Sequence, residues 1–359
     1  MRPLLAIGFG MLATLALPAA AANHAPTLGR SRPVPPVGVG DRLVVGVTGT
    51  TLDRITREAL AKGRIAGIIL LSSNIRSWNQ VRRLTRAASD AAKSAGLPEP
   101  IICTDQEGGR VNRLGKLPGF PSDPSSARLA RRGPAYIKMQ ARKVGAALAD
   151  LGFNVDLAPD TDLDKGTGVI GDRSFGKDPA LVVSCASAAV RGVREAGVYT
   201  VIKHYPGHGL VKGDSHKGLP IARVSSATLR RHEGVFDAVL QSGANGVMLG
   251  HILVPSVDPR YPASLSRAFA GDLRKRLGKD KLIFTDSGSM GALAGFGRQS
   301  DRAARALNAG VDVYLTTTPY ASLGSRFAAQ VANEVTPGRG LFESSSRVRR
   351  WRRGLRPAP

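Results

Sequence analysis

The feature that most constrains the fold is a regular alternation of apolar, β-type runs with helix-like segments. Each of the eight runs is rich in Val, Ile and Leu. Unbroken apolar character is typical of strands covered on both faces, as in a parallel sheet, and differs from the alternating pattern of half-exposed antiparallel strands. The runs lie at residues 42–49, 66–73, 100–107, 153–159, 198–206, 245–252, 281–287 and 311–318.

Most gaps between the runs hold helix-like sequence that ends at a glycine, as a helix C-cap would. Examples are 77–96, 135–152, 178–197 and 227–243. Eight strand–helix units predict an α/β fold, a single (β/α)₈ TIM-type barrel over 41–335 without a second C-terminal domain. The alternative is a doubly wound open sheet, which needs a Gly-rich phosphate-binding turn after its first strand, and "VTGTTLD" is a poor version of that turn.

The two ends of the chain differ from the barrel in composition. Residues 1–22 combine an early Arg, an apolar run too short to span a bilayer, and small residues near 20–22, which predicts a cleavable secretory signal. No Cys follows the run, which disfavours a lipid-modified N-terminus. A Pro-rich linker follows at 23–40, and a basic tail is expected at 336–359. We expect a secreted, periplasmic or wall-associated protein whose mature chain has no transmembrane segment.

The chain is strongly basic, with 51 Lys and Arg against 27 Asp and Glu and a formal net charge of +24. Such an excess favours polyanionic partners, and for an exported protein these are anionic cell-wall polymers or lipid head groups. A solvated basic tail without a partner is the alternative. No nucleic-acid-binding motif is evident, so we expect no specific nucleic acid. The two cysteines, Cys103 and Cys185, are expected to be buried free thiols, although one bridge between them is an alternative.

Polar residues gather where the predicted strands end. Catalytic groups of a (β/α)₈ barrel lie at this rim, so we expect one pocket there. The residues concerned are Asp105, Gln106, Glu107, Lys203, His204, His251 and Asp286.

Two loops offer carboxylates and arginines. "DQEGGRVNRL" at 105–114 contains Asp105 and Arg113, and "IGDRSFGKDP" at 170–179 contains Arg173. Carboxylate acceptors and Arg donors suit a hydroxyl-rich ligand, and the glycines allow close backbone approach. The alternative for both loops is structural ion pairing.

The segment "KHYPGHGLVKGDSHKGLP" at 203–220 is rich in histidine. His204 and His208 have a spacing that would join two metal ligands on a helix, but Pro and Gly between them disfavour a helix. We therefore expect neither a metal nor another cofactor. Asp214 and His216 suit proton transfer, because a carboxylate bound to one imidazole nitrogen leaves the other free to move a proton.

Asp286 ends an apolar run and is followed by small residues that leave its face open. It is a candidate catalytic carboxylate, with helix capping as the alternative. Ser287 is a weaker nucleophile candidate, because the Gly-x-Ser-x-Gly elbow is absent.

Taken together, these segments resemble the bacterial β-N-acetylglucosaminidases of glycoside hydrolase family 3. The resemblance runs from about Val45 to Pro319. It is carried in order by "DQEGGRVNRL", "GFNVDLAP", "IGDRSFGKDP", "KHYPGHGLVKGDSHKGLP", "HILVPSVDPRYPASLS" and "IFTDSGSM". The chain departs from the usual pattern at Ser287 and Gly288, and at "DTDLDKGTG" after the fourth run.

The resemblance implies a role for each matching residue. Asp286 would be the nucleophile, His216 the acid/base and Asp214 its orienting partner. Sugar contacts would come from Asp105, Arg113, Arg173, Lys203 and His204.

The activity implied is that of a retaining exo-β-N-acetylglucosaminidase, which acts on N-acetylglucosamine-containing saccharides such as peptidoglycan fragments or chitin-derived oligosaccharides. The alternatives are another β-glycosidase or a glycoside phosphorylase of the same family, a non-catalytic wall-saccharide-binding protein, and a metal-dependent hydrolase.

Overall fold

The computed structural model describes residues 38–164 and 168–359 of the chain. The expected signal at 1–22 and nearly all of the expected linker at 23–40 lie outside the described residues. Among the helices that are described, none is both long and apolar enough to cross a membrane.

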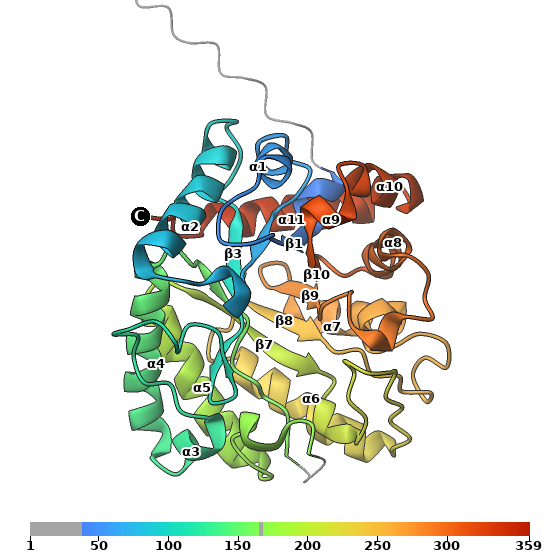
Figure 1. The fold of residues 1–359 in the computed structure, drawn as a ribbon. Helices are drawn as coiled ribbons and strands as arrows, with labels where there is room; N and C mark the ends of the chain where they lie inside the picture. The colour runs from blue at the N-terminus through green and yellow to red at the C-terminus, as the bar shows by residue number, and fades with distance from the viewer. Residues whose placement is uncertain (1–37, 165–167) are drawn as a thin grey trace, which may run out of the picture. The chain divides into compact units, whose positions relative to one another are not determined.

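Eight parallel strands form a nearly closed barrel (Figure 1). Their order, β10-β1-β2-β3-β6-β7-β8-β9, follows the chain around the barrel, which excludes the doubly wound sheet. A bridge between Phe284 and Val313 joins the two outer strands. The strands are β1 (Leu43–Gly46), β2 (Gly67–Ile69), β3 (Ile101–Thr104), β6 (Val155–Asp156), β7 (Tyr199–Tyr205), β8 (Gly246–Leu249), β9 (Leu282–Thr285) and β10 (Tyr314–Pro319). Each overlaps one of the eight predicted runs.

Helices cover the outside of this barrel (Figure 1). Their apolar faces pack on the sheet because helix-period spacing places small and branched residues on one side. Side-chain caps begin several of them, such as the Ser77 hydroxyl that accepts from the amide of Gln80. The helices are α1 (Arg54–Ala61), α2 (Trp78–Lys93), α3 (Ser126–Ala130), α4 (Gly133–Asp150), α5 (Pro179–Glu195), α6 (Ser226–Leu240), α7 (Arg267–Leu277), α8 (Gln299–Ala309), α9 (Tyr320–Leu323), α10 (Phe327–Glu334) and α11 (Arg339–Arg353).

Helix α11 closes the end of the barrel at which the strands begin. Its Trp351 donates from Nε1 to the carbonyl of Asn245, just before β8. Arg352 likewise donates to the carbonyl of Glu99, before β3. Val348 and Trp351 belong to the apolar cluster that fills the barrel interior.

The expectation of a basic tail beginning at 336 is therefore wrong for α11, which is part of the barrel's structure. Between its arginines this segment carries an apolar stripe, formed by Val348, Trp351 and Leu355. The stripe packs against the apolar cluster inside the barrel. Contact with anionic wall polymers stays a prediction.

Both cysteines are buried and free, as expected. Cys103 lies in the apolar cluster inside the barrel, and Cys185 packs between α5 and the sheet. The long connection after β3 also contains a small hairpin that the sequence did not predict, formed by β4 (Gln106–Gly108) and β5 (Val111–Asn112).

Candidate active site

A cavity of about 380 Å³ lies at the end of the barrel where the strands finish. It brings together residues from every cluster that the sequence analysis selected, although Asp214 lies behind His216 and does not line it. The predicted residues in its wall are Asp105, Arg113, Arg173, Lys203, His204, His216 and Asp286.

Lys203 forms the centre of the cavity floor. Its Nζ lies 2.7 Å from Asp105 Oδ1 and 2.7 Å from Glu107 Oε1, so β7 is joined to the segment after β3. Arg113 lies 3.3 Å from the other oxygen of Asp105. Burial alone would lower the pKa of Lys203, but the two carboxylates outweigh it and raise that pKa, so the ammonium stays charged.

Arg173 and Glu107 form a bidentate ion pair. The Nε–Oε2 and Nη2–Oε1 distances are 2.7 and 2.9 Å, and the Glu107 side chain is only 2% exposed. Burial raises the pKa of Glu107, but the charges of Lys203 and Arg173 lower it by more. The net pKa is below the ordinary value, so the carboxylate stays ionised. Arg173 is therefore ion-paired, as the structural interpretation of its loop expects. It also lines the cavity, as the ligand-binding interpretation expects.

Glu107 was named at the rim but was missed as a site residue. It stands two positions after Asp105 in an extended segment, so the two side chains point to the same face. This spacing was the signal that could have identified it.

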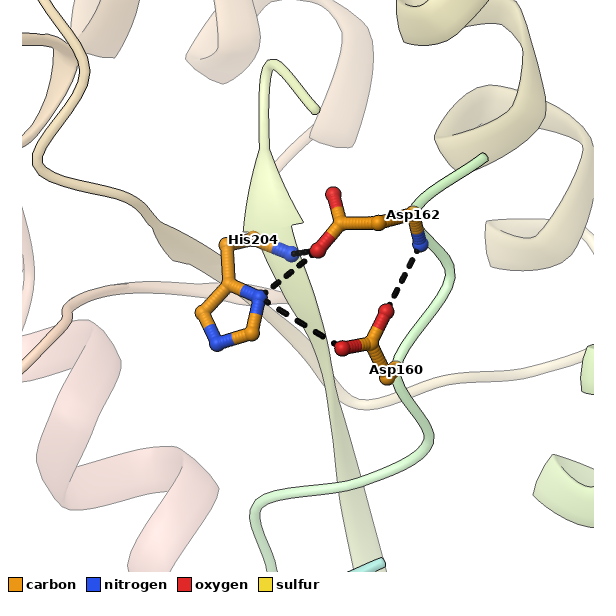
Figure 2. Close-up of side chains that lie close together, drawn as sticks. All are labelled: Asp160, Asp162 and His204. Atoms are coloured by element: carbon orange, nitrogen blue, oxygen red, sulfur yellow. Dashed lines mark hydrogen bonds and ion pairs between the residues drawn. The ribbon is translucent and has the colours of Figure 1, made fainter. Parts of the chain in front are cut away.

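His204 is held by a buried pair of aspartates (Figure 2). Its Nδ1 lies 2.8 Å from Asp162 Oδ2, and the amide of Asp162 donates to Asp160 Oδ1 at 2.9 Å. Burial and the charge of Arg173 lower the pKa of His204 to about 4, so the ring is neutral at neutral pH. A proton on Nδ1 leaves Nε2 as an acceptor for Arg173 Nη2, 3.3 Å away.

Asp160, Asp162 and His204 are also a set of donors that a cation could use, with ligand atoms within 4.8 Å of one another. His204 Nδ1 and Asp160 Oδ1 already have hydrogen-bond partners within this set, whereas Asp160 Oδ2 has none among the described residues. In addition, Arg173 Nη2 lies 3.4 Å from Asp160 Oδ2, where a second cation would be repelled. The arrangement therefore fits the orientation of His204 and Arg173 better than it fits an ion.

Asp286 follows β9 directly and points into the cavity. The amide of Ser287 donates to its Oδ1 at 2.7 Å. Burial raises the pKa of Asp286, but His204, His251 and that amide lower it to about 2, so the carboxylate is ionised at neutral pH. The next helices begin after Met290 and Arg298, so the helix-capping interpretation of Asp286 is wrong.

His251, which the sequence analysis named at the rim without assigning a role, lies near Asp286. Its Nε2 donates to the carbonyl of Ser287 at 2.8 Å, and its Nδ1 accepts from the hydroxyl of Ser264 at 2.7 Å. The buried ring therefore fixes the backbone that carries the carboxylate.

The Asp214–His216 dyad lies on the loop after β7. His216 Nδ1 is 2.8 Å from Asp214 Oδ1, which also accepts from the backbone amide of His216 at 3.0 Å. The His216 side chain is 70% exposed, so its Nε2 is open to a ligand. Burial would raise the pKa of Asp214, but the hydrogen bonds from His216 lower it. The carboxylate can therefore hold the imidazole in one tautomer.

The departure at Ser287 adds a hydroxyl to the cavity wall, beside those of Ser289 and Thr317. Ser289 Oγ lies 2.8 Å from Ser287 Oγ and 2.8 Å from Thr317 Oγ1. The three hydroxyls line the cavity next to Asp286.

Comparison with known proteins relates this architecture to one family. The family described as "Glycosyl hydrolase family 3 N terminal domain" matches residues 39–350. A Beta-hexosaminidase of Thioalkalivibrio sulfidiphilus is 34% identical over 281 residues, which are 76% of this chain and 79% of the relative. A Beta-hexosaminidase of Xanthomonas campestris is 36% identical over 290 residues, 77% of this chain and 84% of the relative.

Solved structures agree. A family 3 glycosyl hydrolase from Mycobacterium smegmatis superposes with a TM-score of 0.76 at 32% identity, covering 89% of this chain and 97% of that one. NagZ from Neisseria gonorrhoeae, in complex with N-trifluoroacetyl-D-glucosamine, gives 0.74 at 28% identity, with 88% and 91% covered. For a β-N-acetylglucosaminidase from Paenibacillus the values are 0.79 and 30%, and the match covers 88% of this chain but only 62% of that one. This chain belongs to glycosyl hydrolase family 3 and is a glycoside hydrolase.

Proposed function

We propose that this protein is a retaining exo-β-N-acetylglucosaminidase in which Asp286 is the nucleophile and His216 the general acid and base. The observation that carries the proposal is that the partly buried, ionised Asp286 and the exposed, Asp214-bound His216 line the same cavity. The relatives named Beta-hexosaminidase support the same sugar class.

In the first step, a carboxylate oxygen of Asp286 attacks the anomeric carbon and the glycosidic C–O bond breaks. The electron pair goes to the departing oxygen, which takes the proton from Nε2 of the His216 imidazolium. The result is a glycosyl ester on Asp286 and a neutral imidazole.

In the second step, Nε2 of neutral His216 removes a proton from water, and the water oxygen attacks the same carbon. The ester C–O bond breaks, which restores the Asp286 carboxylate and the protonated ring. Two inversions at one carbon give net retention. A histidine in this role is neutral as a base, so it adds no negative charge beside the carboxylate.

The charged residues that line the cavity can bind the sugar. Lys203, Arg113 and Arg173 offer N–H donors, while Asp105 keeps acceptor capacity toward the cavity. The cavity of about 380 Å³ is of pocket size, within the range typical of small-ligand sites. These features support removal of one terminal sugar at a time.

We propose peptidoglycan fragments as the natural substrate class, together with export of the chain, because its first 22 residues have the pattern of a secretory signal. Turnover of muropeptides should then exceed turnover of chitobiose. Turnover of chitobiose alone would assign the enzyme to chitin-derived sugars.

The experiment that tests the mechanism is hydrolysis of an aryl N-acetyl-β-glucosaminide by wild type, Asp286→Ala and His216→Ala. Exposed Asp280→Ala is the matched control. Loss of an acid/base group costs typically ~10²- to 10⁴-fold, so His216→Ala should be slow, and least so with a good leaving group. NMR should show the β-anomer as the first product of wild type. Full activity in Asp286→Ala, or an α-anomer, would refute the proposal.

A further inference from the structure

A second cavity lies at the opposite end of the barrel, beside the start of α11. Its volume is about 450 Å³. Its charged lining consists of five arginines and a single carboxylate, that of Glu343. The arginines are Arg42, Arg267, Arg274, Arg339 and Arg347.

Internal partners account for only part of this positive charge. Arg274 and Arg347 each bind one oxygen of the buried Asp312 carboxylate, which lies behind them. Arg42 donates to the backbone carbonyls of Leu307, Val311 and Asp312, which carry no full charge. Counting Asp312 and Glu343, two carboxylates face five guanidinium groups.

The arginines also crowd one another. Burial lowers the pKa of Arg42 to about 10, and the nearby Arg347 acts in the same direction, against the attraction of Asp312. The group is still charged at neutral pH. A mobile anion in the cavity would relieve this repulsion.

Several donors in the cavity wall are unused among the described residues. The Nε atoms of Arg274 and Arg347 are buried and have no hydrogen-bond partner there. Such groups normally have a partner, and where the protein supplies none an ordered water or an ion can take that place. Arg339 and Arg267 are exposed at the mouth, where their planar guanidinium groups can reach a ligand.

The beginning of α11 adds to the same field. Gly338 precedes the helix and provides no side-chain cap, and it lines the cavity together with Arg339 and Gly340. The first amides of a helix are free donors at the positive end of its dipole. They therefore face the same space as the arginines.

We propose that this cavity is a binding site for a phosphate-type oxyanion, either free or carried by a lipid or a wall polymer. Paired guanidinium groups and free helix amides match the geometry of phosphate oxygens. The site is at the end of the barrel opposite Asp286, so a bound phosphate-rich surface would leave the sugar cavity open. The proposal is independent of the mechanism assigned to the first cavity.

The test is calorimetric titration of the full chain with sodium pyrophosphate, at constant ionic strength maintained with chloride. Wild type should bind saturably with a stoichiometry of one. The variant Arg267→Gln/Arg339→Gln removes exposed charges and leaves the Asp312 pairs intact, and it should bind at least ~10-fold more weakly because charge-assisted hydrogen bonds are lost. Arg57→Gln/Arg83→Gln removes the same charge from exposed positions on α1 and α2 and should bind as wild type.

Equal weakening in the two double variants, or no saturable binding by wild type, would overturn the proposal. Vesicles identify the source of the phosphate. Retention of wild type on phosphatidylglycerol but not on phosphatidylcholine, lost in Arg267→Gln/Arg339→Gln, would assign a lipid headgroup. Pyrophosphate binding without retention would assign a soluble or polymer-borne phosphate. Hydrolysis of the aryl glycoside should be unchanged in both double variants.

Discussion

The backbone carbonyl oxygen of His216 accepts a hydrogen bond from the amide of Gly291, with 3.1 Å between the two atoms. The amide of Ala292 makes a parallel bond to the carbonyl of Ser215 at 3.0 Å. These two bonds fasten the loop that carries the dyad to the segment that follows Asp286. The proposed acid/base and nucleophile are therefore positioned by one shared piece of backbone.

Gly291→Ala should disturb this fastening. A Cβ on Gly291 would lie 2.5 Å from the carbonyl oxygen of His216, so the dyad loop would have to move. We expect kcat/KM for an aryl glycoside to fall roughly 10- to 100-fold, as small displacements of reacting groups do. Gly295→Ala is the control, because a Cβ there meets nothing within 4 Å. Unchanged kinetics in Gly291→Ala would show that the loop position does not matter.

The low pKa of Asp286 predicts how kcat/KM changes as the pH falls below 7. Despite burial, nearby charges lower that pKa to about 2, so the carboxylate remains ionised as the pH falls. In His216→Ala, with a leaving group that needs no proton, kcat/KM should stay nearly flat from pH 7 to about pH 4, where an ordinary Asp would be about half protonated. Initial rates over this range measure it. A decline centred near pH 5 would mean that the nucleophile has a raised pKa.

Glu107→Gln should be strongly destabilising. It removes the negative charge between Lys203 and Arg173 and leaves two buried cations with less compensation. Loss of one member of a buried ion pair costs roughly 3–5 kcal/mol in the free energy of unfolding. Urea unfolding measures this quantity. The control is Glu58→Gln on α1, whose exposed pairs with Arg54 and Lys62 should contribute little, and an equal loss in both variants would contradict the argument.

Trp351→Ala should destabilise the barrel at the end where the strands begin. Trp351 is 7% exposed and packs with Tyr199 and Phe284. Truncation of a buried aromatic residue costs roughly 3–5 kcal/mol of unfolding free energy. Phe342→Ala on the same helix is the control, because Phe342 is 60% exposed and should lose little. Similar midpoints for the two variants in a urea titration would show that α11 does not support the barrel.

Removal of divalent metal should leave the rate unchanged. Asp162 already binds His204 and donates its amide to Asp160, and the positive charge of Arg173 lies 3.4 Å from Asp160 Oδ2, where it would repel an ion. After dialysis against EDTA, hydrolysis of the aryl glycoside should match that of untreated enzyme. Activity that disappears and returns with Zn²⁺ would favour the metal-dependent alternative instead.

Local patterns were enough to predict the eight strands and their helices. A strand buried on both faces needs a continuous apolar run whatever surrounds it, so its position is visible in the sequence. The rim residues followed from the same pattern, because strand ends of a barrel meet at one edge. Asp105, Lys203 and Asp286 illustrate this, since each follows or ends an apolar run and all three line one cavity.

Features that depend on distant partners were not predicted. Trp351 and Val348 stand among arginines, and their apolar spacing has meaning only beside an open barrel end. Glu107 and Asp105 both bind Lys203, but the carboxylate of Glu107 is buried more deeply and also pairs with Arg173, and the tertiary fold sets both features. The sequence alone could not exclude helix capping by Asp286, because it does not show where the following helices begin.

The attachment of α11 beneath the barrel affects how the protein is made. The last strand ends at Pro319, yet the apolar cluster inside the barrel includes Val348, Trp351 and Leu355, which come later in the chain. A chain cut short before Arg339 would therefore lose part of the barrel interior and not merely an appendage, so we expect a stable barrel only after α11 has been synthesised.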